Sequence, residues 1–292
     1  MKTFTRTVRE AVKFFLRNGY TSRQELEQWQ AIIRQAAESE TDDDYMSMVS
    51  DRLRKTYDLQ VSKAGALERH KGLSRFTLNY MEPKLRSELD RRILASADLI
   101  KLNRKKAIDT TLSRFSGWAS SIPSADSIAL TGIQGTMRET AAHIQKAAEK
   151  VDYEARRVMI DQSHKLIANI DNIIATGNNA IAAEWHSHWR QPGYDYREDH
   201  KERDKLIYLI RGNWAQKNGY VKAGPAGYLD EITQPGEEVF CRCYVTYLYN
   251  LRSIPEGGGP GGARLVGGEG GEERRLKGGG FWGGGRIPRG ES

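Results

Sequence analysis

The sequence predicts an α+β protein, with a mainly helical N-terminal region followed by a small α+β C-terminal domain and a flexible glycine-rich tail. Three observations support this fold class. Apolar residues recur at helical spacing over most of residues 85–174, an aromatic and β-branched run follows at 239–249, and glycine dominates the chain after residue 255. The domain limits that we expect are 1–125 for the helical region, 126–255 for the C-terminal domain and 256–292 for the disordered tail.

Three short helices are predicted before residue 62. The first runs over 4–18 and ends at Gly19. Ser22, followed three residues later by Glu25, forms a capping box that opens a second helix through about residue 38. Thr41 precedes three aspartates, and acidic groups favour the positive end of a helix dipole, which predicts a third start.

A long helical arm is predicted next. Gly65 and Gly72 interrupt any long helix over 59–80, and Pro83 suits a first helical turn. The apolar residues that follow at helical spacing are Leu85, Leu89, Ile93, Ala97, Ile100, Ile108, Leu112 and Phe115. Such a stripe is typical of a core face or a seam with a partner helix.

A second long helix is predicted after a break. Small polar residues with Pro123 and two glycines mark residues 120–135 as a candidate hinge. Apolar residues then recur at spacings of three and four over 133–174. Gly177 and Asn178 stop the pattern, as expected of a left-handed helix cap.

Short strands are predicted over 181–254, where Trp, Tyr, His, Gly and Pro are frequent. The strongest strand candidate is Val239–Tyr249, in which alternation places Cys241 and Cys243 on one face. A shorter strand over 183–188 would place His186 and His188 together on one face. These elements predict one or two helices packed against a compact sheet.

The net charge of +7 is concentrated in one segment. Residues 51–120 carry 16 Lys and Arg against 8 Asp and Glu. A field of this kind attracts phosphate backbones or an acidic protein surface, although a set of solvated helix faces has the same composition. The candidate nucleic-acid or partner-binding residues are Arg91, Arg92, Arg104, Lys105 and Lys106.

The composition also indicates the cellular environment. No stretch approaches the roughly 20 apolar residues of a membrane span, so we expect no membrane anchor. Charged residues are scattered through the first 18 positions, where a signal peptide would be apolar. The chain has two cysteines, too few and too close together for a secreted disulfide framework, and a reducing cytoplasm fits best.

Cysteine and histidine residues supply the ligand types of a tetrahedral zinc site. Cys241 and Cys243 with His200, and with His186 or His188 as a fourth ligand, could hold a structural zinc ion, and His188 is the fourth ligand that we select. In the alternative interpretation, the two cysteines are small buried hydrophobic residues. We expect no other cofactor and no catalytic residues, because no nucleotide-binding motif is present and no oxyanion-hole loop accompanies Cys241.

The C-terminal residues resemble a known family. The elements that carry the resemblance are Trp-His-Ser-His-Trp-Arg around Trp185, Arg197-Glu198-Asp199-His200, Asp204 and Tyr208, the turn Gln234-Pro235-Gly236-Glu237-Glu238, and Cys241-Arg242-Cys243. Together they resemble the C-terminal module of phage head morphogenesis proteins, the Mu F-like or SPP1-type minor head proteins, over roughly residues 150–255. One departure is that the family commonly has Asp-Gly or Asn-Gly a few residues after the histidine, whereas here Lys205 follows Asp204.

The resemblance implies a minor capsid protein of a tailed bacteriophage rather than an enzyme. Its expected partners are the portal protein, the major capsid protein and packaged double-stranded DNA, and its expected location is the head interior or the portal region of the virion. Two alternatives stay open. The basic segment would also suit a DNA-binding internal or ejected virion protein, and His200 with the cysteines would also suit a metal-dependent hydrolase.

Overall fold

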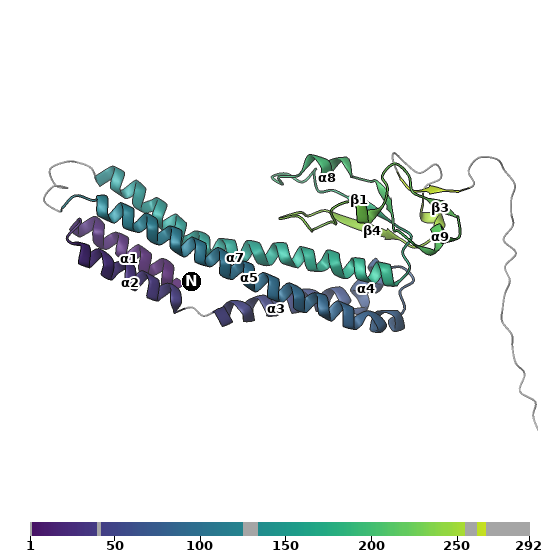
Figure 1. Ribbon diagram of the computed structural model, residues 1–292, viewed down its shortest axis with the longest axis horizontal. Coiled ribbons are helices and arrows are strands. Elements are labelled where there is room, and N and C mark those ends of the chain that lie inside the picture. The colour runs from purple at the N-terminus through teal and green to yellow at the C-terminus, as the bar shows by residue number, and fades with distance from the viewer. Residues whose placement is uncertain (1, 40–41, 125–133, 255–261, 267–292) are drawn as a thin grey trace, which may run out of the picture.

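The computed structural model has the predicted α+β fold (Figure 1). It describes residues 2–39, 42–124, 134–254 and 262–266. Its helices are α1 (Lys2–Asn18), α2 (Arg23–Glu38), α3 (Asp42–Val61), α4 (Lys63–Arg69), α5 (Arg75–Ser121), α7 (Gln134–Gly177), α8 (Glu198–Glu202) and α9 (Trp214–Lys217). Its strands are β1 (Ala182–His186), β2 (Ile207–Leu209), β3 (Val221–Lys222), β4 (Tyr244–Leu248) and β5 (Arg264–Leu265).

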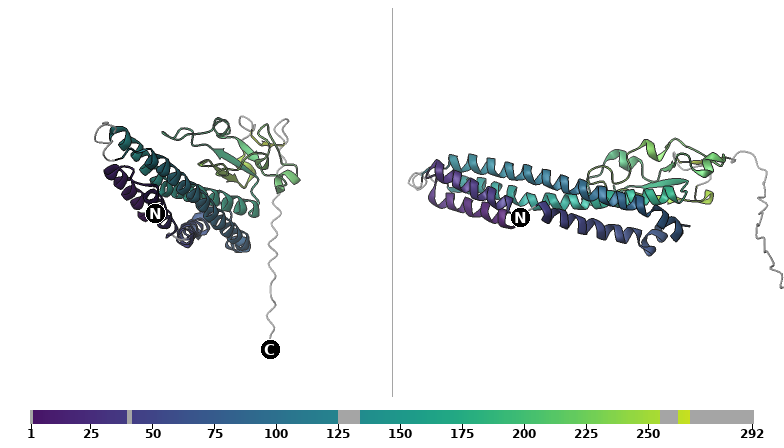
Figure 2. Two further views of the ribbon diagram at one scale, coloured as in Figure 1. Left: turned by 60° about the vertical axis from the view of Figure 1, so that its left-hand side comes forward. Right: turned by 60° about the horizontal axis from the view of Figure 1, so that its bottom comes forward.

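Two long antiparallel helices form the axis of the molecule. α5 has 47 residues and α7 has 44, so at 1.5 Å per residue they are about 70 and 65 Å long. The views in Figures 1 and 2 show the two helices side by side over most of their length, as an elongated hairpin. None of the helices within the described residues is long and apolar enough to span a membrane.

The shorter N-terminal helices cover the hairpin at its two ends. Near the turn of the hairpin, α1 and α2 share a core with the end of α5 and the start of α7. The largest side chains of that core that are fully buried are Phe4, Phe15, Ile33, Phe115 and Ile144. At the other end, α3 and α4 pack against the start of α5 and the end of α7. The predicted helix start at Ser22 is confirmed, because the Ser22 hydroxyl accepts the backbone N–H of Glu25 at 3.1 Å, while the Glu25 carboxylate accepts the Thr21 hydroxyl instead of the Ser22 N–H of a full capping box.

α5 begins eight residues earlier than expected, and Pro83 lies inside it rather than in its first turn. The true start is capped by Ser74, whose hydroxyl accepts the backbone N–H of Thr77 at 3.0 Å. A proline inside a helix removes the hydrogen bond to the carbonyl four residues before it, here Asn79. Asn79 is exposed, so water can satisfy that carbonyl, and the helix continues.

The end of α7 corrects a second expectation. The left-handed residue after this helix is Asn179, with φ of 60°, and not Gly177. Gly177 is the last residue of α7 and lies against α5, because a Cβ at this position would be 2.1 Å from Met81 Sδ. Glycine is therefore needed here for the close approach of the two helices.

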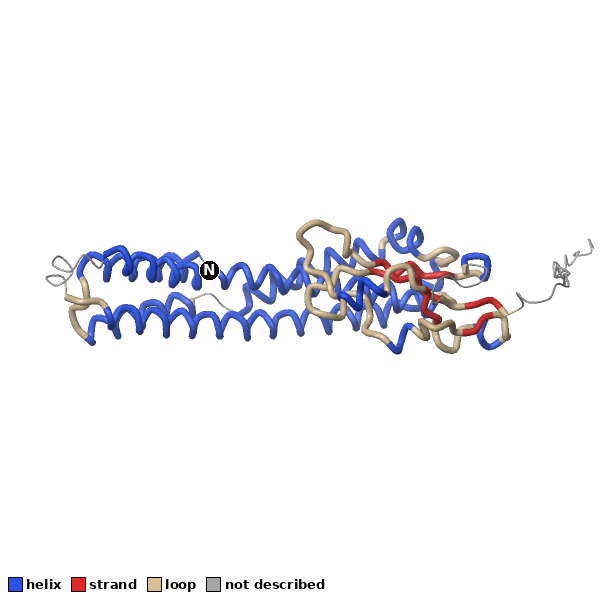
Figure 3. The backbone as a smooth tube through the Cα atoms, turned by 90° about the horizontal axis from the view of Figure 1, so that it is seen from above, coloured by secondary structure: helices blue, strands red, loops and turns tan. Residues whose placement is uncertain are grey.

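The C-terminal module is a small antiparallel sheet that packs beside the last turns of α7 (Figure 3). The strand order is β2-β1-β4, with Ala183 of β1 opposite Tyr208 of β2 and Tyr247 of β4. One face buries Trp185, Tyr208 and Tyr247 together with Ala175 of α7. The Tyr247 hydroxyl also donates to Asn172 Oδ1 of α7 at 3.4 Å.

The predicted strand over Val239–Tyr249 is wrong in its first half. β4 begins only at Tyr244, because Phe240 has φ of 59° and the Cys241 N–H donates to the Glu238 carbonyl at 3.1 Å, which makes a turn. Asp161 of α7 holds this turn by accepting the Phe240 N–H at 2.7 Å. The Arg157 guanidinium lies 4.0 Å from the centroid of the Phe240 ring.

The expected domain limits can be located on the structure only in part. The limit near residue 125 lies at the edge of residues 125–133, which are outside the described part of the chain, and α7 after it packs on α5 in one helical body. Within the segment expected to be a disordered tail, Arg264–Leu265 forms β5 and pairs with β3. The remainder of the expected tail, 255–261 and 267–292, lies outside the described residues.

Candidate metal centre

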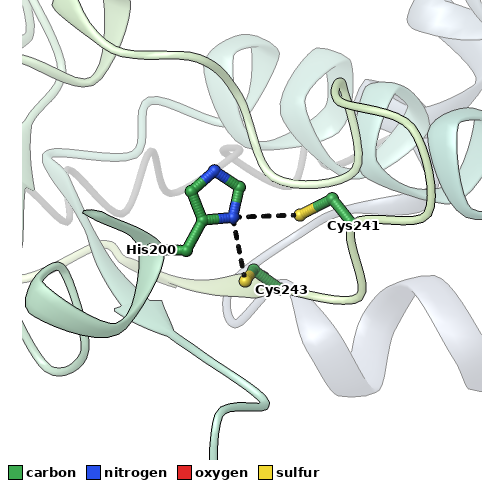
Figure 4. Close-up of side chains that lie close together, drawn as sticks. All are labelled: His200, Cys241 and Cys243. Carbon is green, nitrogen blue, oxygen red and sulfur yellow. Dashed lines mark hydrogen bonds between the residues drawn. The ribbon is translucent and has the colours of Figure 1, made fainter. Parts of the chain in front are cut away.

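The side chain of His200 meets those of Cys241 and Cys243, which lie about forty positions later in the chain (Figure 4). His200 comes from the short helix α8, while Cys241 and Cys243 come from the turn and extended segment that lead into β4. His200 Nδ1 lies 3.5 Å from the Sγ atom of each cysteine. All three residues are buried, with exposed fractions of 1%, 2% and 6% respectively.

These distances fit the ligands of one zinc ion. Zinc binds sulfur at about 2.3 Å and histidine nitrogen at about 2.0–2.1 Å, so two such bonds at a tetrahedral angle place N and S about 3.6 Å apart. The observed separation is 3.5 Å for both pairs. The three ligand atoms lie within 4.8 Å of one another, and the residues present therefore form a possible metal site that is compatible with zinc.

Carboxylates surround the other nitrogen of His200. Its Nε2 lies 3.4 Å from Glu238 Oε1 and 3.9 Å from Asp199 Oδ2. Arg197 and Thr233 hold Glu238, with Arg197 Nε 2.5 Å from Oε2 and the Thr233 hydroxyl donating to Oε1 at 3.2 Å. A proton on Nε2 directed at Glu238 leaves Nδ1 as the lone-pair nitrogen toward the thiols, which is the usual arrangement of a metal-binding histidine.

The thiols of Cys241 and Cys243 share a hydrogen bond, which changes the pKa of each. The hydrogen bond from the Cys243 thiol lowers the pKa of Cys241, against the opposing effect of burial, and the Gly236 N–H adds a hydrogen bond to Cys241 Sγ at 3.4 Å. The same bond and burial raise the pKa of Cys243, which also receives a hydrogen bond from the backbone N–H of His188. Cys241 therefore ionises first, and a thiolate is the form that binds a metal.

The residues that carry the family resemblance lie around this cluster. The ring of Trp185 packs edge-on against His200 with centroids 5.4 Å apart. Asp204 joins two loops by accepting the Ser187 N–H at 2.8 Å and the Trp189 indole N–H at 3.2 Å. Lys205 adopts φ of 69°, so this chain makes a left-handed turn at the position where the family commonly has glycine.

The predicted fourth ligand, His188, does not join the cluster. Its ring packs on the exposed Tyr244 with centroids 5.9 Å apart, and it contributes only its backbone N–H to Cys243. His186 stacks on the same tyrosine at 4.7 Å. The prediction that the two histidines share a face was reasonable, but that face is opposite to the one that buries Trp185.

A cleft of about 690 Å³ opens between α7 and the Phe240 turn, and Cys241 and His164 are among its lining residues. A smaller cavity of about 100 Å³ adjoins it and is lined by Cys243 and again by His164. Partial burial lowers the pKa of His164, and the positive charge of Arg242 lowers it further. Sequence reasoning missed His164, which only the fold brings near residues 200 and 241, and it missed the contact of Glu238 with His200, which also depends on the fold.

Of the predicted binding arginines, Arg92 links the two helices of the hairpin, whereas Arg91 pairs with Glu88 on its own helix. Glu88, only 10% exposed, accepts bonds from Arg91 and Arg92 of α5 and from Asn169 of α7. Arg92 also donates to Gln162 of α7 at 3.2 Å and is 11% exposed. The bonds from Arg92 to Gln162 and from Asn169 to Glu88 cross between α5 and α7, and the Arg91 side chain is 56% exposed.

The other three predicted basic residues lie on α5 between the two helical cores. Arg104 donates to the carbonyl of Ala37 near the end of α2 and lies over the ring of Tyr45 of α3, 5.0 Å from its centroid. It therefore joins two helices. Lys105 and Lys106 are exposed and form no ion pair with another described residue, so they are the members of the set that remain available to a partner.

The chemistry of the cluster is that of metal binding or of a buried thiol pair. Comparisons with protein-family models, with curated proteins and with solved structures found no match for this chain. The geometry and the sequence resemblance are therefore the grounds for a functional proposal.

Proposed function

We propose that this chain is a minor head protein of a tailed bacteriophage and that its C-terminal module contains a structural zinc ion bound by His200, Cys241 and Cys243. The function proposed is in head assembly and in DNA packaging or delivery, through contact with the portal protein and the major capsid protein. The proposed location is the head interior or the portal region, after synthesis in the bacterial cytoplasm.

The burial of the three ligands is the observation that carries the structural zinc site, and the sequence resemblance over residues 150–255 carries the minor head assignment. Catalytic zinc sites keep a position open to substrate, whereas structural sites are closed by protein. Here the ligands are at most 6% exposed, and the surrounding N–H groups and carboxylates fix their orientation. The residues that resemble the family are the same residues that build this core, which favours a structural role for them.

Purified phage particles provide the test of the proposed function. Mature particles and procapsids of the phage that encodes this chain would be purified, and the chain quantified against the portal protein by mass spectrometry. We expect a few copies per particle and co-purification with portal or capsid protein that chelator leaves unchanged. Absence from both kinds of particle would overturn the assignment.

The metal is tested on the isolated full-length protein. We expect one zinc per chain by elemental analysis, and loss of that zinc in Cys241→Ser. His186→Ala is the matched control, because this histidine belongs to the same module but contacts Lys205 and Thr246 instead of the thiols. A wild-type protein that binds no zinc when supplied with it would show that the cysteines are only core residues.

A further inference from the structure

We infer that His164 of α7 is the fourth ligand of this zinc ion. The inference rests on the structural zinc site proposed above and goes beyond it, because it makes the metal a link between the helical hairpin and the C-terminal module. It replaces His188, whose ring lies on the outer face against Tyr244.

The donor set requires a fourth ligand. Structural zinc sites are almost always four-coordinate, and combinations of two cysteines with two histidines are common among them. Within the described residues, the cluster around the two thiols contains His200 as its third member and no fourth His, Cys, Asp or Glu. Glu238 and Asp199 face the Nε2 side of His200, away from the thiols, so neither carboxylate can complete the same site.

His164 borders both openings that lead to the thiols. The cleft that reaches Cys241 and the smaller cavity that reaches Cys243 have one histidine each among their lining residues, and it is His164 in both. The His164 ring forms no hydrogen bond or ion pair with another described residue, so no such contact has to break when it turns toward a metal.

The backbone also brings His164 close to the site. Gly236, with φ of 77°, packs so tightly on α7 that a Cβ there would lie 3.3 Å from the His164 carbonyl oxygen. The N–H of the same glycine donates to Cys241 Sγ. One glycine therefore contacts both the thiol and the helical residue, and a rotation of the His164 side chain is the movement that the inference requires.

Metal titration of the full-length protein tests the inference. Zinc affinity would be measured by competition with a chromophoric chelator, and Co²⁺ would report the ligand set through its visible absorption bands. We expect His164→Ala to weaken zinc binding by at least about 10-fold and to shift the Co²⁺ bands, since a water then replaces an imidazole. His143→Ala is the matched control, because this exposed histidine lies on the same helix at its other end.

The possible outcomes separate the two proposals. Wild-type binding that His164→Ala leaves unchanged would overturn the fourth ligand and keep the zinc site, and so would a loss of affinity in His188→Ala alone. A wild-type chain that binds neither metal would overturn both. His164→Gln keeps the size of the side chain, so it gives the same comparison if the alanine variant is unfolded by circular dichroism.

Discussion

A single methyl group at Gly177 is predicted to destabilise the protein, although alanine is the better helix former. In an open helix, Gly→Ala stabilises by up to about 1 kcal/mol. Here the new Cβ would be 2.1 Å from Met81 Sδ and 3.1 Å from its Cγ, and Met81 is only 4% exposed. Overpacking of this kind costs about 1–3 kcal/mol. We therefore expect Gly177→Ala to lower the free energy of unfolding by up to about 2 kcal/mol, the overpacking cost less the gain of about 1 kcal/mol from helix propensity.

Equilibrium unfolding in urea, followed by circular dichroism, measures this effect. Gly117→Ala in α5 is the matched control, because a Cβ there meets nothing within 4 Å, and we expect it to stabilise by about 0.5–1 kcal/mol. In a Met81→Ala background, Gly177→Ala should change sign and become stabilising. If Gly177→Ala stabilises the wild-type protein as Gly117→Ala does, the close approach of α5 and α7 at this point is refuted.

Three further predictions follow from buried polar contacts. Burial opposes ionisation of Glu88, but the hydrogen bonds that the Glu88 carboxylate accepts outweigh burial and lower its pKa. The ionised carboxylate therefore stabilises the fold above the unfolded pKa, and this stabilisation is lost as the pH falls through the folded pKa. The urea midpoint of the wild-type protein should therefore fall as the pH is lowered through the folded pKa of Glu88, and Glu88→Gln should flatten this pH dependence; an unchanged slope counts against this. Arg104→Ala should lower the melting temperature, measured by differential scanning calorimetry, more than Lys105→Ala does. Equal effects of the two substitutions would refute the role of Arg104 in joining α2 and α3. Asp204→Asn should increase amide hydrogen exchange at Ser187, because the weaker acceptor loosens that loop, and unchanged exchange would contradict it.

Local sequence signals predicted most of the helical part of the fold. Ser22 and Glu25 predicted a helix start, because a helix cap depends on two residues that are three positions apart. The apolar stripe predicted α5, because it depends only on helical spacing along the chain. Pro83 misled the prediction because its tolerance depends on the exposure of Asn79, which spacing alone does not reveal. Gly177 was similarly misread, since its neighbour Met81 lies almost a hundred positions away in the chain.

The candidate site was predicted in its ligand types but not in its surroundings. Cys241, Cys243 and His200 were selected for their chemistry, and the structure brings them together. His188 was selected by alternation along a strand, yet the same alternation directs it to the outer face. The turn at Phe240 depends on Asp161 of α7, and no property of residues 239–243 alone indicates a distant carboxylate.

The continuous course of α7 has a mechanical consequence. This helix starts beside α1 and α2 and ends at the sheet, and α5 accompanies it, so the two ends of the molecule are joined by a stiff rod about 65 Å long. A body that contacts the α1–α2 end is thereby kept at a set distance from one that contacts the sheet. Because the two helices are continuous between the two ends, a displacement at one end moves the other end with it. The length of the helices therefore sets the distance between two surfaces that bind at opposite ends of the molecule.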